Sequence, residues 1–152
     1  MMMQCLSPAE EYIVEQLQHS LHADFTAILL LSKTDGKLHV IFQTGSRSKR
    51  TSKLAFKTNE GIAAPVFKSG RSFISSMASD HASLLFRTCP LLLAERLTSI
   101  ISVPLLQDQT PVGILITGLR NHSRTFHSSE IQVVQREAGR LSSSMTNILN
   151  VI

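Results

Sequence analysis

The sequence has no tryptophan, one tyrosine and two cysteines. Two cysteines, Cys5 and Cys89, are too few for a disulfide framework or for the four soft ligands of a structural zinc site, so we expect free thiols. Long apolar runs are also missing. The stretch 27–31 has five residues, whereas a membrane-spanning helix needs roughly 20. No basic segment followed by an apolar one opens the chain, as a secretory signal would require. We therefore expect a cytoplasmic protein.

Charged residues are few, at 17%, and unevenly placed. The chain carries a net charge of +4, but residues 1–32 contain acidic side chains and no lysine or arginine. The shortage of aromatic residues and the absence of a recognisable helix-turn-helix pair argue against nucleic acid as a partner. The basic residues Arg47, Lys49, Arg50 and Lys53 lie in a serine-rich stretch. They indicate a solvated loop or a docking surface for an acidic partner.

Local signals predict one domain, residues 1–152, in which residues 1–6 form a flexible tail. Ser7 and Glu10 have the spacing of a capping box and Pro8 suits the first helical position, so a helix begins there. Turn residues and alternating apolar residues predict two hairpins later in the chain. The expected elements after the first helix are strands 25–31 and 38–43, an extended piece 54–56, a helix 59–69 ended by Gly70, a short strand 73–74, helical turns within 84–97 interrupted at Pro90, strands 99–106 and 112–119, and a helix 128–152.

The last helix carries an apolar stripe whose spacings alternate between three and four residues. Such a heptad pattern favours packing against another helix, which is the first helix, a second subunit or both. We expect a symmetric homodimer through the terminal helices. An intramolecular layer of two helices on the back of the sheet would produce the same stripe. The stripe consists of Ile131, Val134, Ala138, Leu141, Met145, Ile148 and Ile152.

The order of the elements predicts an α+β fold, with a central antiparallel sheet that carries the N- and C-terminal helices on one face. Four segments resemble the GAF domain family: Gly61–Gly70, Ser99–Leu105, Pro111–Leu115 and Phe126 ahead of the last helix. Together, in this order, they extend the resemblance over most of the chain. The resemblance implies a small-ligand pocket on the other face of the sheet, under helices and loops.

Within that family, the chain resembles the stand-alone GAF nitrate receptors of staphylococcal nitrate-responsive two-component systems. The likeness rests on residues 50–54, 61–63, 89–99 and 118–122. The chain differs in lacking a tryptophan on the second strand, where Phe42 or Val40 stands, and in carrying Cys89 where an aromatic residue is usual. The resemblance implies a non-enzymatic sensor that regulates a cytoplasmic sensor histidine kinase, with the ligand-free protein favouring the complex.

The pocket chemistry also follows from general arguments. A helix that begins near Gly61 leaves the N–H groups of Ile62, Ala63 and Ala64 free, which makes an anion site without basic side chains. Nitrate carries one charge and is weakly hydrated, so an apolar box tolerates it better than phosphate. A tightly packed helix start with no ligand is the alternative. We expect no cofactor, no metal and nitrate as the favoured ligand, bound by Phe42, Ile62, Ala63, Ala64, Cys89, Pro90, Leu91 and Leu92.

Two other function classes remain open. In the first, the domain is an interaction module without a ligand, in which dimerisation or docking through the acidic first helix and the basic loop 47–53 is the whole function. In the second, it is an enzyme like the free-methionine sulfoxide reductases. These enzymes need a cysteine within residues 61–64 and a partner nearby for disulfide exchange, and that stretch is apolar here. We therefore expect no enzymatic activity and no catalytic residues.

Overall fold

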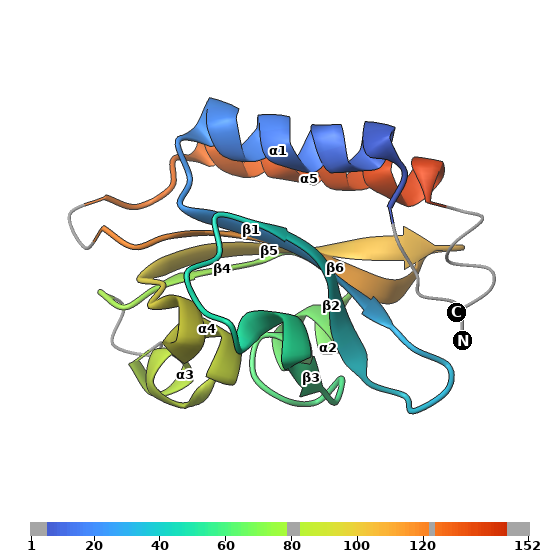
Figure 1. The fold of residues 1–152 in the computed structure, drawn as a ribbon, viewed down its shortest axis with the longest axis horizontal. Helices are drawn as coiled ribbons and strands as arrows, with labels where there is room; N and C mark the ends of the chain where they lie inside the picture. Colours follow the sequence, from blue (N-terminus) through green and yellow to red (C-terminus); the bar gives the residue numbers. More distant parts are fainter. Residues whose placement is uncertain (1–5, 79–82, 122–123, 146–152) are drawn as a thin grey trace.

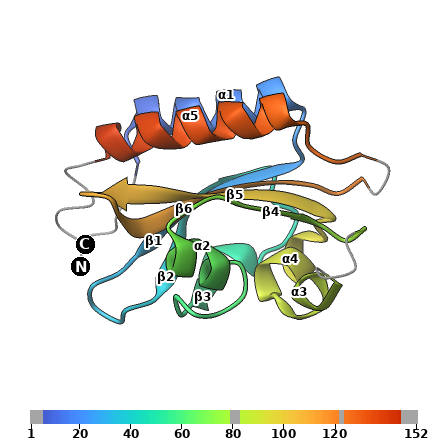
Figure 2. The same cartoon turned by 180° about the vertical axis from the view of Figure 1, so that it is seen from behind.

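The computed structural model describes residues 6–78, 83–121 and 124–145. Its centre is a six-stranded antiparallel sheet with the order β3-β2-β1-β6-β5-β4. The helices α1 and α5 lie side by side on one face, and α2, α3 and α4 cover the other (Figure 1 and Figure 2). This arrangement confirms the predicted α+β architecture. The elements are α1 Pro8–Leu21, β1 Phe25–Leu31, β2 Leu38–Thr44, a 3₁₀ turn Thr51–Lys53, β3 Ala55–Phe56, α2 Ala63–Ser69, β4 Phe73–Ser76, α3 Ser83–Thr88, α4 Pro90–Glu95, β5 Ser99–Gln107, β6 Thr110–Leu119 and α5 Ser128–Ser144.

The first helix begins as its sequence predicts. Ser7 Oγ accepts a hydrogen bond from the Glu10 N–H at 3.2 Å, and Glu10 Oε1 accepts one from the Ser7 N–H at 2.9 Å. The second oxygen of Glu10 accepts a hydrogen bond from Ser144 Oγ on α5 at 2.7 Å. The start of α1 is thereby tied to the end of α5. Leu6 is only 5% exposed and packs beneath the two helices, so the predicted flexible tail does not include it.

The apolar stripe of α5 faces the chain's own sheet. Val134, Ala138, Leu141 and Met145 are at most 2% exposed and pack in one cluster with α1 and with β1, β5 and β6. Ile148 and Ile152, the end of the predicted stripe, lie outside the described residues. An intramolecular layer thus accounts for the stripe. Because these side chains are already buried, the stripe supplies no argument for a second subunit.

The two predicted hairpins are present, with different details. β5 and β6 pair from Ser99↔Leu119 to Gln107↔Thr110, so the turn between them has only the two residues Asp108 and Gln109. Both have positive φ angles, of 51° and 66°, as a tight hairpin turn that follows the strand twist requires. In the first hairpin, Ile28 pairs with Phe42 and Leu29 with Val40, so Ile41 is an extra residue in β2. This bulge ends the simple alternation predicted for residues 38–43.

The helix expected over residues 59–69 begins later, at Ala63. Gly61 has a φ angle of +52°, which lies outside the right-handed helical region. The helix ends as predicted, with Gly70 in the left-handed conformation. The helical turns expected within 84–97 form two helices, α3 and α4, separated at Cys89, directly before Pro90. No helix in the described part of the chain is both long and apolar enough to cross a bilayer.

Candidate functional site

The sheet face opposite the terminal helices is covered by α2 and α4 and encloses one apolar cluster, which we call the inner cluster. Five of the predicted ligand residues belong to it: Ile62, Ala63, Cys89, Leu91 and Leu92, each at most 1% exposed. Ala64 is half-buried and Pro90 is exposed. The full inner cluster consists of Phe25, Ala27, Leu29, Leu38, Phe56, Ile62, Ala63, Val66, Phe86, Cys89, Leu91, Leu92, Leu97, Ile100, Ile114 and Ile116.

Two of the segments that carry the resemblance, residues 61–63 and 89–92, meet at their starts. A Cβ atom added to Gly61 would lie 3.0 Å from Cys89 Sγ, and the positive φ angle of Gly61 also favours glycine. Cys89 is the N-cap of α4, and Pro90 is its first residue. The glycine therefore lets the beginning of α2 approach the beginning of α4. This contact brings residues 61–63 and 89–92 into one region of the inner cluster.

Two expectations about this region differ from the structure. Phe42 packs on the opposite face, against the cluster beneath α1 and α5, because the bulge at Ile41 reverses the direction of the following side chains. Val40 packs against the inner cluster instead. The N–H of Ala63 is not free, since it donates to the Glu60 carbonyl at 3.0 Å. Pro65 has no N–H, so Ile62 and Ala64 are the remaining N–H groups of the predicted anion site.

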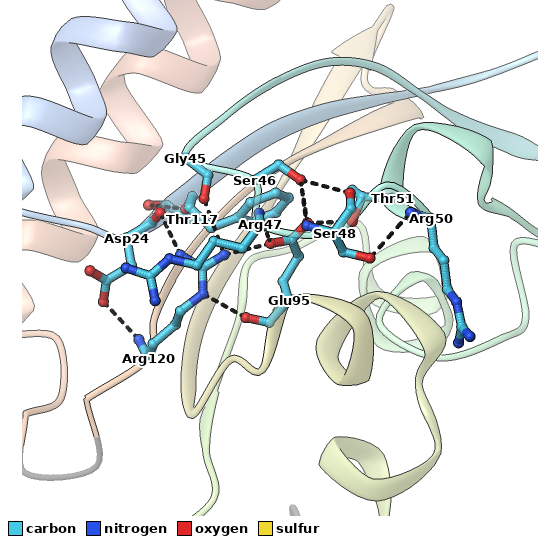
Figure 3. Close-up of polar contacts among 11 residues, drawn as sticks. Asp24, Gly45, Ser46, Arg47, Ser48, Arg50, Thr51, Glu95, Thr117 and Arg120 are labelled. Atoms are coloured by element: carbon cyan, nitrogen blue, oxygen red, sulfur yellow. Dashed lines mark hydrogen bonds and ion pairs between the residues drawn. The ribbon is translucent and has the colours of Figure 1, made fainter.

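Sequence reasoning missed a polar centre at the end of α4 (Figure 3). The Glu95 side chain is fully buried. One carboxylate oxygen accepts hydrogen bonds from the Arg47 N–H at 2.9 Å and from Arg120 Nη2 at 2.5 Å. The other accepts hydrogen bonds from Ser46 Oγ at 2.5 Å and from Thr51 Oγ1. Glu95 is therefore the acceptor that fixes the loop after β2.

Arg120 directly follows β6. It connects this centre to Asp24, in the segment between α1 and β1. Its Nε donates to the Glu95 carbonyl at 2.7 Å, Nη1 to the Asp24 carbonyl at 3.1 Å and Nη2 to the Gly45 carbonyl at 3.1 Å. Its N–H donates to the Asp24 carboxylate at 2.8 Å. We call Glu95, Arg120 and Asp24, with the loop residues bound to them, the Glu95 clamp. It joins α4, the β2–β3 loop, β6 and the α1–β1 connection.

The clamp holds Glu95 in its charged form. Burial by itself would raise the pKa of this carboxyl group, but the hydrogen bonds from Ser46, Thr51 and Arg47 and the charge of Arg120 outweigh it and lower the pKa below its ordinary value. The sequence contains a hint of this centre, because Glu95 ends the apolar run 91–94 and Arg120 follows the apolar strand 112–119. An isolated charge beside a buried run needs a partner. The identity of that partner depends on contacts between residues that are distant in the sequence.

Surface hollows in the described part lie elsewhere. One of about 660 Å³ lies beside the end of α1, where Glu15, His19 and His22 contribute to its lining. Another, of about 260 Å³, lies between α1 and α5. Neither is lined by a predicted ligand residue. Among the described residues, no three histidine, cysteine, aspartate or glutamate side chains are grouped in a way that would hold a metal ion.

Comparison with solved structures gives matches over most of the chain. The GAF domain of an Acinetobacter phosphoenolpyruvate-protein phosphotransferase matches with a TM-score of 0.76 and 17% identity, over 92% of this chain and 81% of that one. Staphylococcus aureus NreA, mutated in its nitrate binding site, matches with a TM-score of 0.68 and 21% identity, over 84% and 98%. A domain from a Sinorhizobium meliloti protein assigned as a two-component sensor histidine kinase matches with a TM-score of 0.70 and 16% identity, over 95% of this chain and 92% of that one.

These identities show a shared fold. No curated protein sequence matches significantly. The sequence model of the family described as GAF domain, however, matches residues 11–145, from within α1 to the end of α5. The match includes both segments that meet at Gly61 and Cys89, and the complete sheet. The chain therefore belongs to the GAF domain family.

Proposed function

We propose that this GAF domain is a cytoplasmic sensor of a small anion, with nitrate as the favoured ligand, and that it regulates a signalling partner such as a sensor histidine kinase. The observation that carries the proposal is the meeting of residues 61–63 with residues 89–92 inside the inner cluster. These two segments are among the four by which the chain resembles nitrate receptors. The structural similarity to NreA supports the ligand, and the similarity to a kinase domain supports the kind of partner.

The inner cluster suits a weakly hydrated, singly charged ligand. Its side chains are apolar and nearly inaccessible to solvent, so a multiply charged anion would lose its hydration without gaining a basic partner. Ligand entry requires α2 or α4 to move, because Ile62, Leu91 and Leu92 close the region. Since Glu95 ends α4, a movement of α4 would act directly on the Glu95 clamp. Through Arg120 and Asp24, the clamp would transmit it to the terminal helices that a partner contacts.

The first experiment measures the melting temperature with nitrate, nitrite and chloride at matched ionic strength. A ligand at 100 times its dissociation constant adds about 2.7 kcal/mol of stability, which raises the melting temperature of a domain of this size by about 5–10 °C. We expect this rise with nitrate and none with chloride. No rise with any of the three anions would contradict the ligand proposal.

A pair of matched variants tests the position of the site. Ala63→Leu adds volume to the inner cluster, and Ala138→Leu adds the same volume to the cluster under α5; both alanines are at most 2% exposed. Each change should cost about 1–3 kcal/mol through overpacking. Only Ala63→Leu should remove the nitrate-induced rise in melting temperature. Nitrate binding to Ala63→Leu with unchanged affinity, measured by calorimetry, would place the ligand elsewhere.

The interaction module is the second candidate function, and the tight closure of the inner cluster favours it. In that case the domain acts through its outer faces, by dimerisation or docking. A reductase-like enzyme has less support, because Cys89 is buried at the start of α4 and the stretch 61–64 has no cysteine; Cys5 lies outside the described residues. Failure of every anion to stabilise the protein, together with a measurable dimer, would favour the module.

A further inference from the structure

One buried hydroxyl group in the sheet lacks the partner that its counterparts have. Ser102 Oγ is inaccessible to solvent, and it neither donates nor accepts a hydrogen bond among the described residues. Each of the other buried serines and threonines in the described part has a side-chain hydrogen bond. These are Thr26 with Thr117, Thr51 with Glu95, Thr98 with the Leu119 carbonyl, and Ser99 with the Arg124 carbonyl.

The register of the sheet shows which way Ser102 points. Ser102 pairs with Ile116 on β6 and with Phe73 on β4. Directly paired residues share a face of an antiparallel sheet; Ile116 belongs to the inner cluster, and Phe73 packs against it. The neighbours along the strand, Ile101 and Val103, belong to the opposite cluster. The unpartnered hydroxyl is therefore directed into the interior that α2 and α4 cover.

A second unpartnered atom lies on this face of the sheet, and the two atoms differ in how well they suit an anion. Gln43 Oε1 is also buried without a partner, and Gln43 lies in the same row of the sheet, through Ala27 and Ile116. It is three strands from Ser102, or roughly 14 Å at the usual strand spacing. A carbonyl oxygen repels an anion, whereas a hydroxyl group donates a hydrogen bond. Of these two unpartnered atoms, only the Ser102 hydroxyl group can donate to an acceptor-rich ligand, which favours the β5 end of the row.

We propose that Ser102 is a ligand-binding residue, whose hydroxyl group donates a hydrogen bond to an oxygen of a small, singly charged oxyanion bound between β5 and α2. This inference rests on the proposed sensing function and adds a polar contact to it. A buried hydroxyl group without a partner is destabilising. Its presence in an otherwise apolar interior is explained when the bound ligand supplies the missing acceptor. α2 packs on β5 and β6, the strands of Ser102 and of its paired residue Ile116, so a ligand between the sheet and this helix would lie on the face to which the Ser102 hydroxyl group points.

The test compares Ser102→Ala with Thr117→Val, using nitrate as the probe. Removing an unpartnered hydroxyl group should leave the melting temperature without nitrate unchanged or higher, and should weaken nitrate binding by about tenfold or more. Thr117 pairs with Ile101 on the opposite face, and its hydroxyl group is bonded to Thr26 and to the Phe25 carbonyl. Thr117→Val should therefore lower the melting temperature and leave nitrate binding unchanged. Ser102→Thr, which keeps the hydroxyl group, should retain more nitrate affinity than Ser102→Ala.

The outcomes separate this inference from the function on which it rests. If nitrate stabilises the wild-type protein and Ser102→Ala equally, the sensing function stands and the role of Ser102 is overturned. If Ser102→Ala lowers the melting temperature without nitrate and keeps the affinity, the hydroxyl group serves the fold through a bridging water, and the inference also fails. If nitrate does not stabilise the wild-type protein, both the nitrate proposal and its contact with Ser102 are overturned.

Discussion

At the scale of single residues, Glu95 has the most demanding environment in the described part of the chain. Four donors, one of them the Arg120 guanidinium group, satisfy a carboxylate that has no contact with solvent. Glu95→Gln keeps the shape of the side chain but leaves the Arg120 charge without its counter-charge. We expect a loss of about 3 kcal/mol in the free energy of unfolding at neutral pH, measured by urea denaturation. Glu130→Gln, which removes the partner of the more exposed Arg124, should cost less than about 1 kcal/mol.

The same residue makes stability depend on pH. Because the pKa of Glu95 is lower in the folded protein than its ordinary value of 4.5, the unfolded chain binds a proton at higher pH than the folded one does. The stabilisation is fully present above pH 4.5 and is lost as the pH falls through the folded pKa. Melting temperatures between pH 7 and pH 3 should therefore fall less steeply for Glu95→Gln than for the wild-type protein. Parallel curves would show that Glu95 is protonated equally in both states.

At the scale of elements, α5 is a structural part of the core. Leu141 is fully buried against the sheet and α1, so Leu141→Asp places an unpaired charge in an apolar interior. We expect unfolding, or a loss of at least about 4 kcal/mol, and not the simple separation of a dimer into folded monomers. Circular dichroism during urea denaturation measures this. Gln132→Asp, on the exposed side of the same helix, is the control; a folded, fully stable Leu141→Asp monomer would contradict this role of α5.

Elements with strong local signals could be predicted from the sequence. The capping box at Ser7, the break at Pro90 and the apolar runs of β1, β5 and β6 depend on residues close in the chain, and the structure confirms them. The late start of α2 depends on the left-handed Gly61, which Cys89 approaches. The bulge at Ile41 depends on pairing between strands. Local patterns do not contain such information, so they predict Phe42 on the wrong face of the sheet.

The candidate site likewise contains residues that could be predicted from the sequence and residues that could not. Residues 61–63 and 89–92 could be named because they carry the family resemblance, and the structure brings them together. The Glu95 clamp could not be assembled, because its side-chain contacts connect residues that are 25 to 96 positions apart. Ser102 has no distinguishing local pattern either. Its unusual status appears only when every buried hydroxyl group is matched with a partner, which requires the strand register.

At the scale of the whole molecule, the outer side of the terminal helices is the surface through which we propose that a homodimer would form. Tyr12 is 62% exposed there and borders the hollow between α1 and α5. Glu15 on α1 is exposed, as are Arg136 and Arg140 on α5. A two-fold related copy can set α1 of each subunit against α5 of the other, so that acidic side chains face basic ones. Such an interface would weaken at high salt.

Tyr12→Glu tests this interface without touching the core. An exposed tyrosine at the centre of a helical interface is the kind of residue that contributes more than its share of binding energy, so we expect the dimer to dissociate at least tenfold more readily in analytical ultracentrifugation. The melting temperature of the diluted monomer should not change, because Tyr12 lies outside the buried clusters. Leu93→Glu is the matched control: Leu93 is 52% exposed on α4, on the other side of the sheet. A Tyr12→Glu protein that sediments as the wild type does, together with dissociation caused by Leu93→Glu, would move the interface to the face of α4, where a partner would sense ligand entry directly.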